Sequence, residues 1–145
     1  MLRVSRKADY ALIALKHLAQ HGQREALSAA DISSSYGISA PLLAKVLQRL
    51  AKKGLLQARH GSSGGYTLTR DPGLITALEV VQAIDGPISI TSCTSRRGDC
   101  DHLSNCTVRD PLRRVNESVL QLLNQVTLLQ LLNEQPTSPV VGLTT

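Results

Sequence analysis

Two short helical segments joined by a tight turn, with a glycine-rich hairpin directly after them, most strongly constrain the fold of this chain. Residues 28–37 and 39–54 each begin with a serine that suits a helix N-cap and end at a glycine that suits a helix stop. Strand-like runs over 55–60 and 66–70 flank the glycine-rich stretch 61–65. A hairpin directly after a helix-turn-helix is typical of a wing, so the pattern predicts a winged helix-turn-helix.

Further helices are predicted on both sides of this unit. Residues 6–21 repeat apolar positions at helical spacing, and Gly22 follows them as a natural stop. A capping box from Thr76 to Glu79 begins another helix, which runs to about Asp85. Hydrophobic residues make up 42% of the chain, but Phe and Trp are absent. The core must therefore consist of Leu, Ile, Val and Ala, which favours a mainly α fold of helices packed on helices.

A last helix is predicted to begin at Asp110 and Pro111, with the proline in its first turn. Its apolar positions are spaced 3-4-3-4-3, at Leu112, Val115, Val119, Leu122, Val126 and Leu129. Such a seam is typical of a long dimerisation helix that pairs with its twin in a homodimer, although it also suits packing on its own chain. The predicted organisation is a DNA-binding winged helix-turn-helix over 1–72, a linker helix and cysteine loop over 73–109, the dimerisation helix over 110–134, and a disordered tail over 135–145.

All three cysteines of the chain lie within one polar stretch. Cys93, Cys100 and Cys106 are separated by six and by five residues. Thiolates on one loop can converge on a metal, and three of them favour an iron–sulfur cluster. Three thiolates with His102 also suit tetrahedral Zn²⁺, and redox-active free thiols are a third interpretation. The spacing favours the cluster but leaves zinc and free thiols open.

Positive charge is concentrated in the first half of the chain. Residues 1–70 contain eleven Lys or Arg and three acids, whereas residues 71–145 contain five Arg and eight acids. A basic domain suits a polyanion, so we expect a double-stranded DNA operator as the partner. The expected contacts lie near the N-terminus, at the two short helices and in the wing: Arg3, Arg6, Lys7, Ser28, Ala40, Pro41, Ala44, Lys45, Arg49, Arg59, His60 and Ser62.

Several other classes of protein are disfavoured. The sequence has no Ser/His/acid or paired-carboxylate constellation, so we expect neither an enzyme nor a small-molecule substrate. Its apolar runs are too short for a transmembrane helix, and its first residues lack the apolar region of a secretory signal. We therefore expect a cytoplasmic protein that does not act at a membrane.

Several stretches together resemble the IscR/NsrR-type winged-helix regulators of the Rrf2 family. They are residues 5–15, 30–33, 37–39, 50–56 and 64–68, followed by the three cysteines before a leucine-rich helix. The resemblance implies a homodimeric transcription regulator with one iron–sulfur cluster, 2Fe–2S or 4Fe–4S, in each subunit. Within the family the chain is most similar to the branch that regulates the SUF cluster-assembly operon. The same scaffold tuned to nitric oxide, as a repressor, is the alternative.

Two positions depart from the family's pattern. IscR-type regulators carry a histidine ligand three residues after the third cysteine, where this chain has Arg109, whose protonated guanidinium cannot ligate iron. In the nitric-oxide-sensing branch a carboxylate on the partner subunit's first helix is the fourth ligand. The resemblance therefore implies Asp9 of the partner subunit in this role, with His102 as the alternative. Ala44 and Lys45 replace the family's usual acid and glutamine, so a known operator sequence does not carry over.

Overall fold

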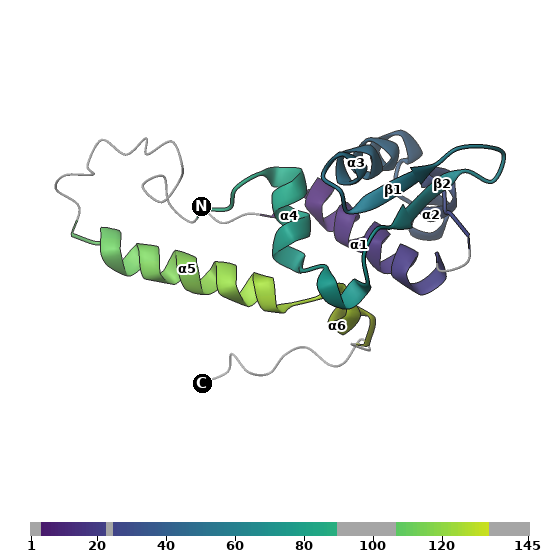
Figure 1. The fold of residues 1–145 in the computed structure, drawn as a ribbon. Coiled ribbons are helices and arrows are strands. Elements are labelled where there is room, and N and C mark those ends of the chain that lie inside the picture. Colours follow the sequence, from purple (N-terminus) through teal and green to yellow (C-terminus); the bar gives the residue numbers. More distant parts are fainter. Residues whose placement is uncertain (1–3, 23–24, 90–106, 134–145) are drawn as a thin grey trace.

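The computed structural model describes residues 4–22, 25–89 and 107–133. Its elements are, in chain order, α1 (Arg6–His21), α2 (Ala29–Tyr36), α3 (Ala40–Lys52), β1 (Leu56–Arg59), β2 (Gly65–Leu68), the short 3₁₀ helix η1 (Pro72–Leu74), α4 (Ala77–Asp85), α5 (Arg109–Gln125) and α6 (Leu128–Asn133). Figure 1 shows α1, α2, α3 and the hairpin gathered into one body, with α4 beside it and α5 extending away as an arm. The predicted mainly α, winged helix-turn-helix fold is confirmed.

Side-chain caps begin α2 and α4 at the places that the sequence indicated. The Ser28 hydroxyl accepts from the Asp31 N–H (3.2 Å), and the Asp31 carboxylate accepts from the Ser28 N–H (2.9 Å), which completes a capping box. At α4 the Thr76 hydroxyl accepts from the Glu79 N–H (3.2 Å). The Glu79 carboxylate, however, pairs with Arg70. The second half of the expected capping box at α4 is thus replaced by an ion pair with Arg70, which lies between β2 and η1.

The hairpin is fastened to the chain that precedes α2. Its strands are antiparallel, with Leu56 opposite Leu68 and Arg59 opposite Gly65. Leu27 extends this pairing, because its carbonyl accepts from the Tyr66 N–H (2.8 Å) and its N–H donates to the Tyr66 carbonyl (3.2 Å). The wing is therefore held at β2 as well as through its connection to α3.

Aliphatic side chains form the core, as the absence of Phe and Trp requires. The largest fully buried side chains are Leu15, Leu18, Ile32, Leu43, Leu47, Leu50, Leu55, Ile75, Val80 and Leu128. They come from α1, α2, α3, the start of the wing, α4 with its preceding turn, and α6. The core therefore joins the helix-turn-helix to α4 and to the C-terminal end of the described chain.

The single C-terminal helix that the sequence predicts is two helices in the structure. α5 ends at Gln125, and Val126 is extended, with ψ near 117°. The Ala77 N–H donates to the Val126 carbonyl (2.8 Å), and the Leu128 N–H donates to the Ile75 carbonyl (3.0 Å). These bonds to the start of α4 replace the helical pattern and return α6 to the core. The predicted apolar seam is therefore interrupted before its last two positions.

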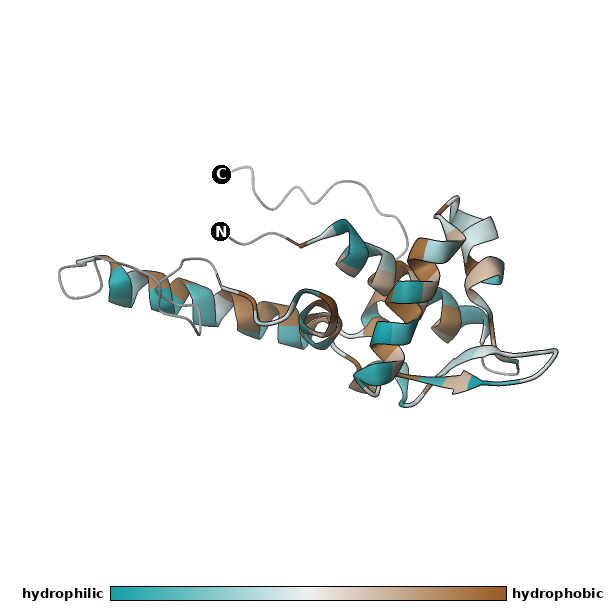
Figure 2. Cartoon of the chain, turned by 90° about the horizontal axis from the view of Figure 1, so that it is seen from above, coloured by the Kyte–Doolittle hydropathy of each residue, from teal (hydrophilic) through white to brown (hydrophobic). Residues whose placement is uncertain are grey.

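α5 presents part of its apolar side to solvent. Figure 2 shows hydrophobic and hydrophilic residues alternating along this helix, as expected for an amphipathic one. Val115 is 50% exposed and Leu122 is 63% exposed, whereas Val119 between them is half-buried. Within the described ranges, no helix combines the length and hydropathy that crossing a bilayer requires.

Candidate DNA-binding surface and its link to α4

One exposed face of α3 carries the central residues expected to read DNA. Pro41, Lys45, Gln48 and Lys52 are all exposed, and their spacing of four, three and four residues places them on one side of the helix. We call these four residues the α3 stripe. Lys52 was not among the expected contacts, although its position seven residues after Lys45 is the signal that would have found it. Ala40 and Ala44 are half-buried.

The wing presents a second group of the expected contacts. Arg59 ends β1, and His60 and Ser62 lie in the loop that follows; all three are exposed. Figure 1 shows this loop projecting beyond the body of the molecule. Gly61 has φ near 112°, a left-handed backbone that glycine adopts without strain, so the loop turns sharply at this point. A projecting, cationic hairpin tip has the shape and charge to enter a groove of DNA.

The expected DNA contacts nearest the N-terminus differ in how exposed they are. Arg6 and Lys7 are exposed in the first turn of α1, whereas Arg3 lies outside the described residues. Ser28 is half-buried, and both its backbone N–H and its hydroxyl donate to the Asp31 carboxylate. The backbone bond is the larger of the two causes that lower the pKa of Asp31, and the hydroxyl bond is the second. The Ser28 side chain is therefore engaged in capping α2.

Arg49 makes a bond that the sequence did not indicate. It was expected to contact DNA, and it is exposed, but its Nε donates to the backbone carbonyl of Ala83 in the last turn of α4 at 2.9 Å. This bond joins the expected recognition helix to α4. The guanidinium still has further N–H groups, so a DNA contact through them stays a prediction.

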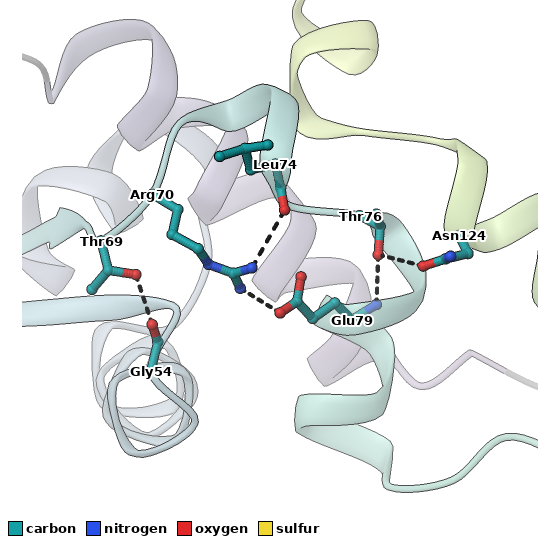
Figure 3. A network of polar contacts seen from close by, with 7 residues as sticks. All are labelled: Gly54, Thr69, Arg70, Leu74, Thr76, Glu79 and Asn124. Atoms are coloured by element: carbon teal, nitrogen blue, oxygen red, sulfur yellow. Dashed lines mark hydrogen bonds and ion pairs between the residues drawn. The ribbon is translucent and has the colours of Figure 1, made fainter.

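The base of the wing is also bonded to α4 (Figure 3). The Thr69 hydroxyl donates to the Gly54 carbonyl at 2.6 Å, which fixes the end of β2 to the end of α3. The next residue, Arg70, forms an ion pair with Glu79 of α4, and its Nη1 donates to the Leu74 carbonyl at 3.4 Å. The paired side chains are 38% and 39% exposed, so solvent screening makes this a weak contribution to stability. Together with the Arg49–Ala83 bond, this ion pair holds α3 and the wing base, the two elements expected to contact DNA, against α4.

The two ends of α4 contact α5 and α1. At its start, Thr76 and Asn124 of α5 are joined by a hydrogen bond of 3.3 Å (Figure 3). At its end, the Asp85 carboxylate accepts from the Ser5 N–H at 3.0 Å and from the Ser5 hydroxyl. The beginning of α1 and the end of α4 therefore lie side by side. α4 thus connects α3, the wing, α1 and α5.

The expected metal ligands lie mostly outside the described residues. Cys93, Cys100, Cys106 and His102 are all in this part of the chain, so their geometry is not described. Three thiolates with a carboxylate or imidazole are a donor set that fits an iron–sulfur cluster, and three with an imidazole also fit zinc. Asp9 is exposed in the first turn of α1, and its carboxylate makes no hydrogen bond or ion pair with the described residues. The Asp9 carboxylate is thus exposed, as a ligand to a metal centre of another subunit would have to be.

Comparison with known proteins finds a family and relatives that match nearly the whole chain. The family model Rrf2, described as "Iron-dependent Transcriptional regulator", matches residues 4–134. The HTH-type transcriptional regulator IscR of Yersinia pestis is 34% identical over 134 residues, which cover 92% of this chain and 81% of the relative. IscR of Photorhabdus laumondii is 33% identical over 141 residues, covering 97% of this chain and 85% of the relative.

Solved structures agree in fold. CymR (YrzC), the global cysteine regulator of B. subtilis, superimposes with a TM-score of 0.74 at 27% identity, covering 91% of this chain and 97% of CymR. IscR of T. potens superimposes with a TM-score of 0.71 at 27% identity, covering 90% and 86%. These relatives are transcriptional regulators rather than enzymes, and the family implies DNA as the partner. The match over residues 4–134 and the winged helix-turn-helix together show that the chain belongs to the Rrf2 family of iron-dependent transcriptional regulators.

Proposed function

We propose that this protein is a homodimeric regulator that binds operator DNA and senses iron–sulfur status through a cluster held by Cys93, Cys100 and Cys106. Its targets would be genes of SUF-type iron–sulfur cluster assembly. One observation carries the proposal: the segment with all three cysteines begins a few residues after α4 ends, and α4 is bonded to both α3 and the wing base. That segment therefore adjoins the helix that supports both DNA-reading elements, and a change in it can be passed to them through this helix.

The ligand set gives such a site its sensitivity. Three thiolates hold iron firmly, whereas a carboxylate or imidazole exchanges more readily and exposes one iron to oxidants or to loss. The partner subunit's Asp9 is the proposed fourth ligand, with His102 as the alternative. Support for Asp9 comes from its exposure on α1, which leaves its carboxylate accessible to another subunit. The cationic Arg109, exposed at the first turn of α5, is available to offset the negative charge of such a cluster.

The proposed DNA interface combines the α3 stripe with the wing. Lys45 suits a contact to guanine or phosphate, and Arg59 and His60 suit a groove next to the helix. Arg6 and Lys7 suit phosphates at the edge of the site. The wing and helix face of one subunit read one half-site, so a homodimer is needed to match a two-fold operator.

A thiol-based sensor without a cluster is the second candidate. The similarity to the cysteine regulator CymR, at 27% identity over 91% of this chain, supports this thiol-based candidate. In this case the cysteines would respond by oxidation or modification of thiolates. Zinc bound by the same thiolates is a variant of this candidate.

The decisive experiment measures iron, acid-labile sulfide and zinc in protein purified without oxygen. DNA affinity is measured in parallel, on fragments selected by the same preparation from a random-sequence pool. Near-equal iron and sulfide, lost in Cys100→Ser but kept in the control Ser104→Ala, supports the cluster. Zinc without sulfide, or thiol-dependent DNA binding without either metal, contradicts the cluster and supports the second candidate. Protein that selects no DNA sequence contradicts both.

A further inference from the structure

We propose that Arg49 is a positioning residue that fixes α3 to the last turn of α4. Through this bond, a change in the cysteine-bearing segment would alter the position of α3. This inference rests on the proposed function, because it names the residue that connects the sensing segment to the DNA-reading helix. It differs from the sequence-based expectation, in which Arg49 contacts a DNA phosphate. The two roles predict different effects of replacing arginine by lysine: a positioning arginine would be lost, whereas a phosphate contact would be kept.

The Ala83 carbonyl needs a donor from outside its own helix. In a continuing α-helix it would accept from the N–H of residue 87, but Pro87 has no N–H. The next available N–H, on Gly86, donates to the Gln82 carbonyl at 2.9 Å. The Arg49 Nε, at 2.9 Å, supplies the missing donor. A cation at this position also interacts favourably with the negative end of the α4 dipole.

Arg49 occupies the edge of α3 that faces α4. The neighbouring position Gln48 belongs to the exposed α3 stripe, whereas Leu50 on the other side is fully buried. One turn earlier on the same edge, Val46 is 3% exposed and belongs to the same packed core as Ala83. Arg49 therefore lies over the α3–α4 packing rather than in the middle of the face offered to DNA.

The same turn of α4 is held from a second side. Ser5 donates to the Asp85 carboxylate, so α1 and α3 both bond to the last three residues of α4. Only residues 86–89 separate this turn from the undescribed segment that carries the cysteines. A displacement of that segment would act on this turn, and the directional Nε–H···O bond would pass it to α3. Lysine, whose ammonium is a point charge on a flexible stem, cannot reproduce this geometry.

The test compares Arg49→Lys, Arg49→Gln and the control Lys52→Gln, all in the full-length protein. Each is measured for DNA affinity in two states: as purified with iron and without oxygen, and after iron removal by a chelator. We expect Arg49→Lys to reduce the affinity ratio between the two states at least about fivefold, a typical size for an allosteric coupling. The slope of log affinity against log salt should stay unchanged in this variant, because no phosphate contact is lost. Lys52→Gln should leave the affinity ratio between the two states unchanged. It should reduce the magnitude of the negative salt slope by about 0.9, the contribution of one phosphate contact.

The opposite pattern overturns the inference. A phosphate-binding Arg49 would give a normal state ratio in Arg49→Lys and a salt slope lowered by about 0.9 in Arg49→Gln. If instead the proposed function is wrong, the wild-type protein itself would have the same DNA affinity with and without iron. The positioning bond is tested separately by amide hydrogen exchange in the free protein. Arg49→Lys should speed exchange over residues 83–89 while Lys52→Gln does not, and equal exchange in both variants contradicts the bond's role.

Discussion

Ser5 and Asp85, eighty residues apart in the chain, are joined by two hydrogen bonds that link the start of α1 to the end of α4. The Ser5 N–H and hydroxyl both donate to the Asp85 carboxylate, and the same hydroxyl accepts from the Ala8 N–H at 3.1 Å. Ser5 is thus the N-cap of α1 and also its attachment to the end of α4. The carboxylate adds a favourable negative charge near the N-terminus of α1.

Replacing Ser5 by alanine should therefore destabilise the fold by about 1 kcal/mol, within the usual range for loss of an N-cap. Asp85→Ala removes the acceptor for both Ser5 donors, and the double variant should show a coupling energy of about 0.5–1 kcal/mol. Urea unfolding of the four proteins measures these values. Ser34→Ala, whose hydroxyl bonds only within α2, is the matched control and should change stability little. Additive effects of Ser5→Ala and Asp85→Ala would contradict the coupling.

Helix caps and helix ends show which parts of the structure the sequence could predict. Local signals were interpreted correctly: Ser28 is the N-cap of α2, and Gly22 and Gly37 are the C-caps of α1 and α2. Such signals involve residues a few positions apart, so periodicity and caps are enough to find them. The exposure of Lys45 on α3 followed from the same periodicity.

The remaining features depend on contacts between distant segments. The break after Gln125 arises because Val126 and Leu128 pair with the chain around Ile75, about fifty residues earlier. Nothing in the apolar spacing of the last helix signals this pairing. In the same way, Arg49 looked like a DNA contact because its partner, the Ala83 carbonyl, is a backbone group without any sequence signature. The exposure of residues on α3 was therefore predictable from the sequence, whereas the contacts that position α3 were not.

Gly65 is a position where any side chain should disrupt the wing. A Cβ added there would lie 2.4 Å from the backbone carbonyl atoms of Leu27 and 2.7 Å from the Ser28 nitrogen. The Leu27 carbonyl already accepts from the Tyr66 N–H, and the Ser28 N–H already donates to the Asp31 carboxylate, so these backbone atoms cannot move without breaking hydrogen bonds. Gly65→Ala should destabilise the protein by about 1–3 kcal/mol, as overpacking does, and reduce DNA affinity. Thermal unfolding measures the first effect, and Ser62→Ala at the exposed tip should leave stability unchanged.

The lowered pKa of His17 should make stability depend on pH. The His17 Nδ1 lies 2.9 Å from the Tyr36 hydroxyl, and the pKa of His17 is lowered, first by burial and then by the charge of His21. Between the lowered pKa and the unfolded value near 6.5, the unfolded chain binds more protons. Stability should therefore fall as pH decreases through about 6.5 and reach its full loss below the folded pKa.

His17→Gln should remove most of this dependence, and His21→Gln should raise the pKa of His17 toward its ordinary value. Urea unfolding at pH 7.5 and 5.5, with NMR titration of the imidazole, measures both effects. Asp31 also has a lowered pKa, but its stabilising contribution is lost only in a more acidic range, as pH falls below about 4. A wild-type His17 that titrates above 6.5 would contradict this explanation.

The exposed apolar residues of α5 should carry the proposed homodimer. Val108, Val115 and Leu122 are 53%, 50% and 63% exposed, and they recur every seven residues, as on one side of a helix that meets its twin. Leu122→Asp places a charge on the apolar face of such an interface and should shift the protein to monomers in sedimentation experiments. Gln121→Asp, an exposed neighbour, should remain dimeric. A wild-type protein that is monomeric at micromolar concentration would contradict the proposed dimer.

Leu128 and Leu129 should differ sharply although they are adjacent. Leu128 is fully buried in the core, whereas Leu129 is 45% exposed. The difference follows from the break after α5, since an uninterrupted helix would have placed Leu129, not Leu128, on the apolar seam. Leu128→Ala should destabilise the protein by about 2–5 kcal/mol, because it removes a buried side chain and leaves a cavity. Leu129→Ala should cost much less. Urea unfolding of the two variants compares them directly, and similar losses, or the reverse order, would support one continuous C-terminal helix.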